Sequence, residues 1–359
     1  MRFFLFFLHK KNKILIKKKK YLNQLMGDFL STPNKEKDSS DDENSYIEYG
    51  ASAMQGWRYR MEDAHITSLN NNNKFDIFGI FDGHGGKEVS QFAKNHFVKE
   101  FLKNKNTNQD NIKKSLEETF LKIDELLTTE SGKKELKEYS KKSKKEDDEQ
   151  DKKNKTTSEQ KEYIKYLDPK SSENCDIASM TGCTSCICII DQINKKIYFA
   201  NSGDSRVVLC KKGKAYQMSL DHKPDLSIEK NRIYKANGWV NEGRIKGNLN
   251  LSRSLGDLEY KQNKNLSPQE QMITAFPDVN IEKIDDNCDF IIIGCDGIWD
   301  CLSNQQACDY VKNGFEKKKF KKISKIIEDM MDNILAKDKM NETGIGCDNM
   351  SCIVIRFKH

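Results

Sequence analysis

Short apolar runs rich in β-branched residues recur along this chain and follow one another across short turns. Residues 186–190 and 196–200 form one such pair, and residues 206–210 begin directly after a turn at 202–205. Two further runs lie at 289–294 and 350–355. Because these segments are neighbours and are mostly not separated by helices, the pattern favours antiparallel sheets with helices packed outside them.

Helical periodicity fills much of the remaining sequence. Residues 111–127 repeat apolar side chains at three- and four-residue spacing, which predicts an amphipathic helix. Another helical pattern begins at Lys87, and others occupy about 226–237, 304–317 and 320–336. These helices are candidates for the outer layers of the fold.

Two polar segments contain few residues able to form a core. Residues 31–45 read as a polar linker, and residues 128–174 are dominated by Lys, Glu, Asp, Ser and Gln. Such stretches bury too little apolar surface to offset the entropy lost on ordering. We therefore expect one domain at 46–357, a disordered N-terminal extension at 1–45, and a disordered insertion at about 128–174. A solvated loop is the simplest interpretation of the insertion; an interaction tail or a phosphorylation target is the alternative.

The basic charge is concentrated at the start of the chain. The net charge is +6, but residues 1–25 carry eight Lys and Arg side chains and no acid, so the remainder carries −2. A nucleic-acid partner is therefore not expected from overall charge. The apolar run at residues 3–8 is too short for a signal peptide or a membrane span.

Residues 26–31, MGDFLS, match the N-myristoylation pattern M-G-x-x-x-[ST]. The signal works only if Gly27 becomes the amino terminus. Either Met26 is the true start, with residues 1–25 an artefact, or the match is a coincidence. Membrane contact is expected only in the first case.

The chain contains eleven cysteines, several of them within strand-like apolar runs. Cys183 and Cys186 form a single CxxC pair, but a structural zinc site needs a second pair or a suitably spaced His pair. The cysteines therefore fit small buried side chains in a reducing compartment. We expect a cytoplasmic protein, with a nuclear location or membrane association through an N-terminal lipid as the alternatives.

Acidic residues recur where strand-like segments end. At four such ends an acid stands beside glycine or another polar turn residue: Asp82–Gly83, Gly203–Asp204, Asp296–Gly297 with Asp300, and Asp348–Asn349. The adjacent carboxylates Glu62 and Asp63 add a further pair. One such end is usually only a turn. Together, carboxylates with few His or Cys residues favour a shared Mg²⁺ or Mn²⁺ centre.

Eight segments of this chain occur in the order typical of one enzyme family: GASAMQGWRYRMEDAH (50–65), FGIFDGHGG (78–86), TGCTS (181–185), ANSGDSRVVL (200–209), LDHKPD (220–225), LSRSLGD (251–257), IIIGCDGIWD (291–300) and CDNMSCIVI (347–355). In these segments the chain resembles the metal-dependent serine/threonine protein phosphatases of type 2C. The resemblance implies an α/β sandwich of two mostly antiparallel sheets flanked by helices, with a two-metal site at one edge.

The resemblance also implies metal-binding roles. Asp82 is expected to bridge two Mg²⁺ or Mn²⁺ ions, and Gly83 to offer its carbonyl to one of them. Asp296 and Asp348 are expected to bind the other ion. Glu62 matches an acid that holds the first ion directly or through water, and Asp63 one that orients a metal-bound water. Asp204 and Asp300, together with Asp296, match a weaker third site.

For catalysis, the resemblance assigns Arg58 as the clamp on the phosphate and His84 as the general acid. A water bridging the two ions would attack phosphorus, and His84 would protonate the departing seryl or threonyl oxygen. No phosphoenzyme is needed. Consistently, no cysteine has an arginine six positions downstream, as a thiolate phosphatase would require.

Other positions receive weaker assignments. Arg232 falls in the flap near the substrate, and Asp257 is expected to support the site rather than bind metal. Arg206 is expected to form a scaffold ion pair, and His65 to be structural. Cys183 stands where the family often has serine, but Thr184 and every metal-binding position are retained.

We expect a monomeric enzyme that acts on phosphorylated proteins. One alternative is a catalytically silent binding module on the same fold, which predicts lost metal carboxylates. Another is a nucleic-acid or membrane-surface protein driven by residues 1–20, which predicts binding that weakens steeply with salt.

Overall fold

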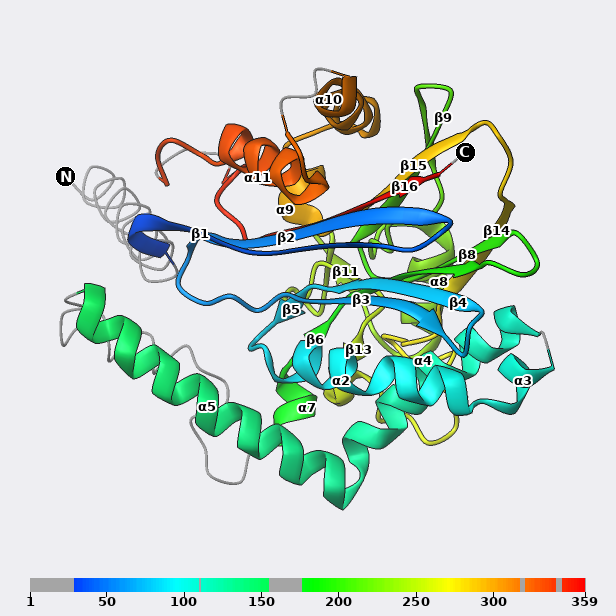
Figure 1. Ribbon diagram of the computed structural model, residues 1–359. Coiled ribbons are helices and arrows are strands. Elements are labelled where there is room, and N and C mark those ends of the chain that lie inside the picture. Colours follow the sequence, from blue (N-terminus) through cyan, green and yellow to red (C-terminus); the bar gives the residue numbers. More distant parts are fainter. Residues whose placement is uncertain (1–28, 110, 155–175, 317–319, 340–343, 359) are drawn as a thin grey trace, which may run out of the picture.

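Two antiparallel sheets pack face to face in the computed structural model, which describes residues 29–109, 111–154, 176–316, 320–339 and 344–358 (Figure 1). The six-stranded sheet has the order β1 (Phe29–Glu43), β2 (Ile47–Arg58), β16 (Met350–Phe357), β15 (Cys288–Gly294), β9 (Arg206–Lys211) and β10 (Lys214–Gln217). The five-stranded sheet has the order β14 (Asp278–Lys283), β8 (Lys196–Ser202), β7 (Ser185–Asp191), β4 (Phe75–Phe81) and β3 (Ala64–Asn71). Neighbouring strands in both sheets are antiparallel, as the sequence predicted.

The central strands are apolar throughout because both of their faces are covered. In β4, Phe78 and Ile80 belong to the core between the sheets, whereas Ile77 and Phe81 belong to the core under the helices. All seven residues of β4 are buried. A strand covered on both faces reads as a continuous apolar run, which explains why these segments were recognisable in the sequence.

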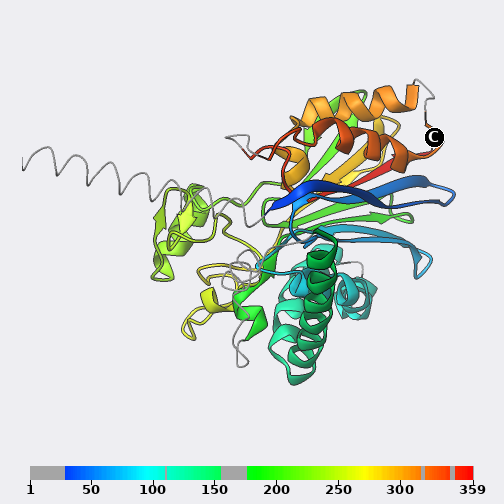
Figure 2. The ribbon, with the colours of Figure 1, turned by 90° about the vertical axis from the view of Figure 1, so that its left-hand side faces the viewer.

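Helices cover the outer face of each sheet. On the five-stranded side lie α2 (Glu88–Lys103), the short α3 (Lys105–Asn108), α4 (Ile112–Thr128), α5 (Glu130–Asn154) and α7 (Ile177–Met180). On the six-stranded side lie α9 (Asp296–Trp299), α10 (Asn304–Glu316) and α11 (Ile323–Ile334). Figure 2 shows these two helical layers above and below the sheets. The predicted sandwich is therefore confirmed.

Smaller elements stand beside the sandwich. The flap contains α8 (Ser227–Lys235), β11 (Val240–Asn241) and β12 (Arg244–Ile245), and it has a small core of its own that includes Ile233, Ile245 and Ile273. A three-stranded sheet joins β13 (Leu255–Gly256), β6 (Gly182–Cys183) and β5 (Gly83–His84), and a 3₁₀ turn, η1 (Leu258–Tyr260), follows β13.

Residues 29–45 were expected to be disordered, and this expectation was wrong for most of the segment. Residues 29–43 form β1, an edge strand paired with β2. Its polar side chains find polar partners on α11: Lys37 contacts Asp332, Ser39 contacts Glu328, and Asp41 contacts Ser324. Main-chain pairing and these contacts stabilise the strand without many apolar side chains.

The expected disordered insertion was also partly wrong. Residues 130–154 form the helix α5, which is anchored by the buried Leu136 and by side-chain contacts to α2. Residues 155–174, Gly27 and the basic tract at 1–25 lie outside the described residues. Among the described residues, no helix is both long and apolar enough to cross a membrane.

The cysteines that the structure describes are free thiols, and all except the half-buried Cys301 are buried. Cys183 and Cys186 lie in β6 and β7 as core residues. The prediction of small buried side chains therefore agrees with the part of the chain that the structure describes.

Candidate active site

The predicted acids meet because antiparallel neighbours share an edge. The strand β15 ends at Gly294 and β16 begins at Met350, so Asp296 and Asp348 flank the same end of that pair. In the opposite sheet β4 ends beside the start of β3, where Phe81 pairs with Ala64. Asp82 and Asp63 therefore reach the same edge from the second sheet.

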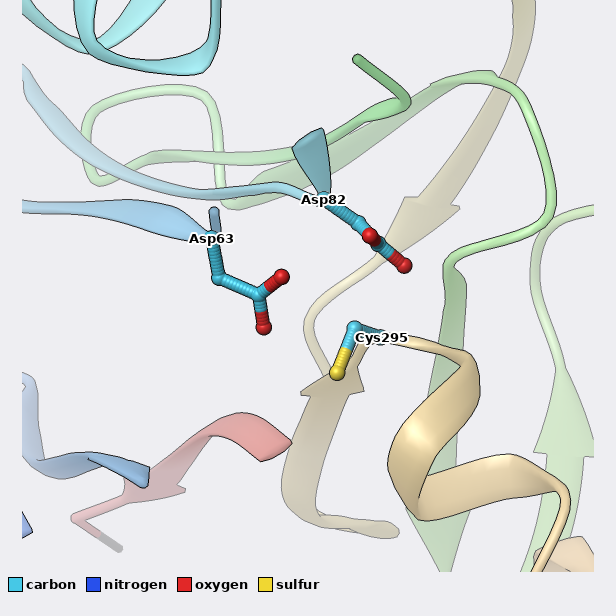
Figure 3. A group of neighbouring side chains, drawn as sticks. All are labelled: Asp63, Asp82 and Cys295. Atoms are coloured by element: carbon cyan, nitrogen blue, oxygen red, sulfur yellow. The ribbon is translucent and has the colours of Figure 1, made fainter. Parts of the chain in front are cut away.

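The side chains of Asp63, Asp82 and Cys295 share the space between these strand ends (Figure 3). One ligand atom from each lies within 4.8 Å of the others. Desolvation raises the pKa of Asp82 well above its ordinary value, and the negative charges of nearby carboxylates raise it further: Asp296, Asp63, Asp348 and Asp204. Desolvation also raises the pKa of Asp296 well above its ordinary value, and the charges of four neighbouring carboxylates raise it further: Asp204, Asp348, Asp300 and Asp63. The structure thus brings the predicted acids together.

Asp63 is a buried acid of this group. Burial raises its pKa to about 7, against a lowering effect from the hydroxyl of Ser351, which donates to Oδ2 at 2.7 Å. Burial disfavours the charged form of a carboxylate, and at Asp63 this effect outweighs the hydrogen bond that favours the charged form. A divalent cation at this edge would favour the ionised form.

Sequence reasoning did not identify Cys295 as a neighbour of the acids, although it directly precedes Asp296. Burial and the charges of Asp63, Asp82 and Asp296 raise the pKa of its thiol well above the usual range. The sulfur also accepts the backbone N–H of Ser351 at 3.2 Å. A protonated thiol is a poor metal ligand, so the oxygen donors favour a hard cation here.

Local packing explains the glycine after Asp82. A Cβ at Gly83 would lie 2.4 Å from the carbonyl oxygen of Glu62, so only glycine allows these two loops to approach. Thr184 fixes Asp82 from the other side: its hydroxyl accepts the Asp82 N–H at 3.2 Å, and its N–H donates to the Asp82 carbonyl at 2.9 Å. This contact gives a structural reason for the retained threonine.

Asn349 holds the loop that carries Glu62, and sequence reasoning gave it no role of its own. Its side-chain oxygen accepts the Glu62 N–H at 3.0 Å, and its amide donates to the carbonyls of Gln55 and Arg60 at 2.8 and 3.0 Å. The only signal in the sequence was its position directly after Asp348. It ties the end of β2 to the start of β16.

Arg58 lies at this edge with its guanidinium on Asp348, Nη2 to Oδ2 at 2.6 Å. Burial alone would lower the pKa of Arg58, but the Asp348 carboxylate, with Glu62 and Asp296, raises it overall. The buried Nε–H of Arg58 has no hydrogen-bond partner among the described residues. Arg58 therefore offers a fixed positive charge and a donor at the candidate site.

His84 contacts Asp257, which was expected to support the site rather than bind metal. Its Nε2 lies 2.7 Å from Oδ2 of the buried Asp257, which also accepts the Ser254 hydroxyl at 2.5 Å. Burial would lower the pKa of His84, but the Asp257 carboxylate raises it overall. A Cβ at Gly182 would meet both His84 and Asp257 within 2.6 Å, so glycine is required there.

The acids of the predicted third site lie next to a lysine that sequence reasoning missed. Asp204 is buried, Asp300 is exposed, and the ammonium of Lys223 contacts the Asp204 carboxylate. Burial would lower the pKa of Lys223, but Asp204, with Asp296 and Asp300, raises it overall. Its place in the motif LDHKPD was the available signal.

Arg232 lies in the flap as expected, but its guanidinium points inward. It donates to Glu229 and to the carbonyls of Gln271 and Ser252 at 2.7, 3.1 and 2.6 Å. Its donors are engaged within the protein, and its place near the substrate stays a prediction. Arg206 does form the expected scaffold pair, with two bonds to Asp221 at 3.0 and 2.6 Å.

A family model described as "Protein phosphatase 2C" matches residues 47–140 and 131–343. The chain belongs to the protein phosphatase 2C family. This is a family of metal-dependent serine/threonine phosphatases, so the predicted enzyme class is confirmed.

Named relatives of this 2C phosphatase cover nearly all of its length. "Probable protein phosphatase 2C 6" of Paramecium tetraurelia is 43% identical over 333 residues, which make up 93% of this chain and 100% of that protein. "Probable protein phosphatase 2C 21" of Arabidopsis thaliana is 40% identical over 93% of this chain and 93% of that protein. A solved phosphatase from Toxoplasma gondii shares the fold, with a TM-score of 0.64, 22% identity, and coverage of 90% of this chain and 96% of that one.

Proposed function

We propose that this chain hydrolyses phosphoserine and phosphothreonine in phosphorylated proteins, with two Mg²⁺ or Mn²⁺ ions held by Asp82, the Gly83 carbonyl, Asp296 and Asp348. The observation that carries the proposal is the meeting of Asp82, Asp296 and Asp348 at one edge, from loops of both sheets. When bound, the ions supply an activated water and positive charge beside the phosphoryl group. Glu62 and Asp63 would complete the oxygen donors around them.

Arg58 would hold the phosphoryl oxygens. Its planar guanidinium suits phosphate, and its contact with Asp348 fixes it beside the acids. The Nε–H of Arg58 has no hydrogen-bond partner among the described residues, so it could donate to a phosphoryl oxygen. Fixed positive charge at this position stabilises the charge that spreads over the phosphoryl oxygens during transfer.

His84 would donate a proton to the departing seryl or threonyl oxygen. The Asp257 carboxylate raises the pKa of His84, which favours the protonated imidazole near neutral pH. Alkoxide leaving groups are poor, so a general acid contributes roughly 10²- to 10⁴-fold. Asp204 and Asp300 would provide a weaker third cation site beside Lys223.

Hydrolysis of a phosphothreonine peptide tests the proposal. Wild-type protein should be active with Mn²⁺ or Mg²⁺ and inactive with excess chelator. Asp82→Asn should lose at least about 10³-fold in kcat, because the variant would lack the carboxylate charge that would hold the ions. Activity that survives the chelator, or an Asp82→Asn variant as fast as wild type, would reject the two-metal mechanism.

His84→Gln separates proton donation from metal binding. We expect its defect to be about 10²-fold or more with the phosphothreonine peptide and much smaller with an aryl phosphate, whose leaving group needs no proton. The silent-module alternative predicts no turnover of either substrate by the wild type.

A further inference from the structure

The helix α5 extends from the end of α4 along the outside of the molecule and reaches back to the catalytic edge (Figure 1). There Asp147 receives two-pronged hydrogen bonds from Arg60: Nε lies 3.1 and 3.0 Å from the two carboxylate oxygens, and Nη2 lies 2.5 Å from Oδ2. Arg60 stands two residues from both Arg58 and Glu62. This contact therefore joins α5 to the loop at 58–63.

The neighbouring acid on α5 contacts the second catalytic loop. The carboxylate of Glu146 pairs with the ammonium of Lys87, which follows the glycines after His84. The loops at 58–63 and 82–87 come from different strands, β2 and β4. Two consecutive residues of α5 thus contact both loops, Asp147 through a half-buried pair and Glu146 through a side chain that is 61% exposed.

The position of α5 is fixed by contacts elsewhere along the helix. Leu136 is buried in the core, His96 contacts Glu135 at 2.9 Å, and Asn95 donates to the Tyr139 hydroxyl at 2.7 Å. Figure 2 shows α5 in the helical layer beside α2 and α4. These contacts hold α5, and with it Glu146 and Asp147, in place independently of the two loops.

Side-chain pairs join α5 to these loops. A cavity of about 100 Å³ separates them, lined by polar side chains that include Arg60, Lys87, Ser140 and Ser143. The side chains of Arg60 and Asp147 are only 23% and 21% exposed. A half-buried, two-pronged Arg–carboxylate pair is stronger and more directional than an ordinary surface pair.

We propose that Glu146 and Asp147 are positioning residues for the phosphatase reaction: they hold the loops that carry Arg58 with Glu62 and Asp82 with His84 in register across the catalytic edge. The expected effect on kcat rests on the proposed function, whereas the contacts between α5 and the loops do not. It gives the charged insertion a role in catalysis without contact with substrate. Small displacements of reacting groups have large effects on rate, so losing the pairs should lower kcat more than it raises KM.

Asp147→Asn and Glu146→Gln remove one charge each with little change in shape. The matched control is Glu138→Gln, which removes an exposed charge from the same helix away from both loops. Hydrogen–deuterium exchange of the peptides covering 58–63 and 82–88, in the full chain with Mn²⁺, reports loop motion directly. We expect exchange about fivefold faster in both single variants and unchanged in the control.

Kinetics with the phosphothreonine peptide provide the second readout. Each variant should lose about three- to tenfold in kcat, with KM within about twofold of wild type. Exchange and kcat equal to those of Glu138→Gln would overturn the proposal. Because exchange needs no substrate, faster loops in a chain whose wild type is inactive would support the positioning contacts while rejecting the proposed function.

A double-mutant cycle separates the pair from general destabilisation. If Arg60 acts through Asp147, the variant Arg60→Met with Asp147→Asn should have the same kcat as Arg60→Met alone. Losses that multiply would show that the two side chains act independently and would contradict the inference.

Discussion

At the scale of residues, His84 and Asp257 form the pair whose chemistry is most sharply defined. The carboxylate lies 2.7 Å from the imidazole and is itself buried and bonded to Ser254. Burial would raise the pKa of Asp257, but the His84 charge and the hydrogen bonds lower it overall. Each partner therefore favours the charged form of the other, which keeps a proton on His84.

Asp257→Asn removes the charge but retains a hydrogen-bonding side chain. We expect kcat for the phosphothreonine peptide to fall by about tenfold or more, because less of the imidazole is protonated at neutral pH. The rate with an aryl phosphate should change by less than about threefold. Asp286→Asn, on an exposed turn, is the control. Equal losses with the two substrates would mean that Asp257 does not act through His84.

At the scale of elements, the edge strand β1 supplies a cap to the helix α11. The N-cap residue Lys322 makes no side-chain capping bond, but Asp41 accepts the Ser324 N–H at 2.8 Å and the Ser324 hydroxyl at 2.5 Å. An acid at a helix N-terminus accepts hydrogen bonds from the unpaired backbone N–H groups, and its negative charge interacts favourably with the helix dipole. β1 is thus joined to the sandwich by its side chains as well as by its backbone.

Asp41→Ala should lower the free energy of unfolding by about 1 kcal/mol, the usual value of an N-cap side chain. Asp38→Ala is the matched control, since alternation along the strand directs Asp38 away from α11. Urea denaturation of the two variants compares them directly. Equal midpoints would show that this cap contributes nothing measurable.

These elements also show where prediction from the sequence succeeds. Strands such as β4 and helices such as α4 were recognisable because burial imposes apolar runs or a helical repeat. β1 was missed because its side chains are polar and their partners on α11, Ser324 and Asp332, lie far along the chain, although its backbone partner β2 follows directly. The acids of the candidate site were identified by type and by their position at strand ends, and their individual roles by the family resemblance. Asn349 and Cys295 gained a role only through their three-dimensional contacts.

At the scale of the whole molecule, the candidate metal centre connects the two sheets. Asp82 and Asp63 come from the five-stranded sheet, and Asp296 and Asp348 from the six-stranded sheet. Without a cation, desolvation and mutual repulsion raise the pKa of Asp63, Asp82 and Asp296. Cation binding would relieve that repulsion and link the sheets, so metal, protons and stability are coupled.

The sign of this coupling follows from the raised pKa values. The folded state binds protons on these acids more tightly than the unfolded state, in which a carboxyl pKa is about 4. Their stabilising contribution is therefore fully present below about pH 4 and is lost progressively as pH rises through about 7, the pKa of Asp63. In excess chelator, the thermal midpoint should be at least about 3 °C higher at pH 5.5 than at pH 8.

Asp63→Asn should flatten this pH dependence, and Mn²⁺ should raise the midpoint more at pH 8 than at pH 5.5. Scanning calorimetry with and without Mn²⁺ measures both effects. A chelated protein that is more stable at pH 8 would contradict the assigned charge coupling.

Anomalous diffraction from crystals grown with Mn²⁺ would locate the ions that the acids at this edge are proposed to bind. We predict two strong peaks at the edge between the sheets, both bound by Asp82, with Asp296 and Asp348 on one of them, and no peaks there in Asp82→Asn crystals. Strong peaks only at other places on the molecule, or none beside Asp82 at saturating Mn²⁺, would show that these acids do not form a two-metal centre.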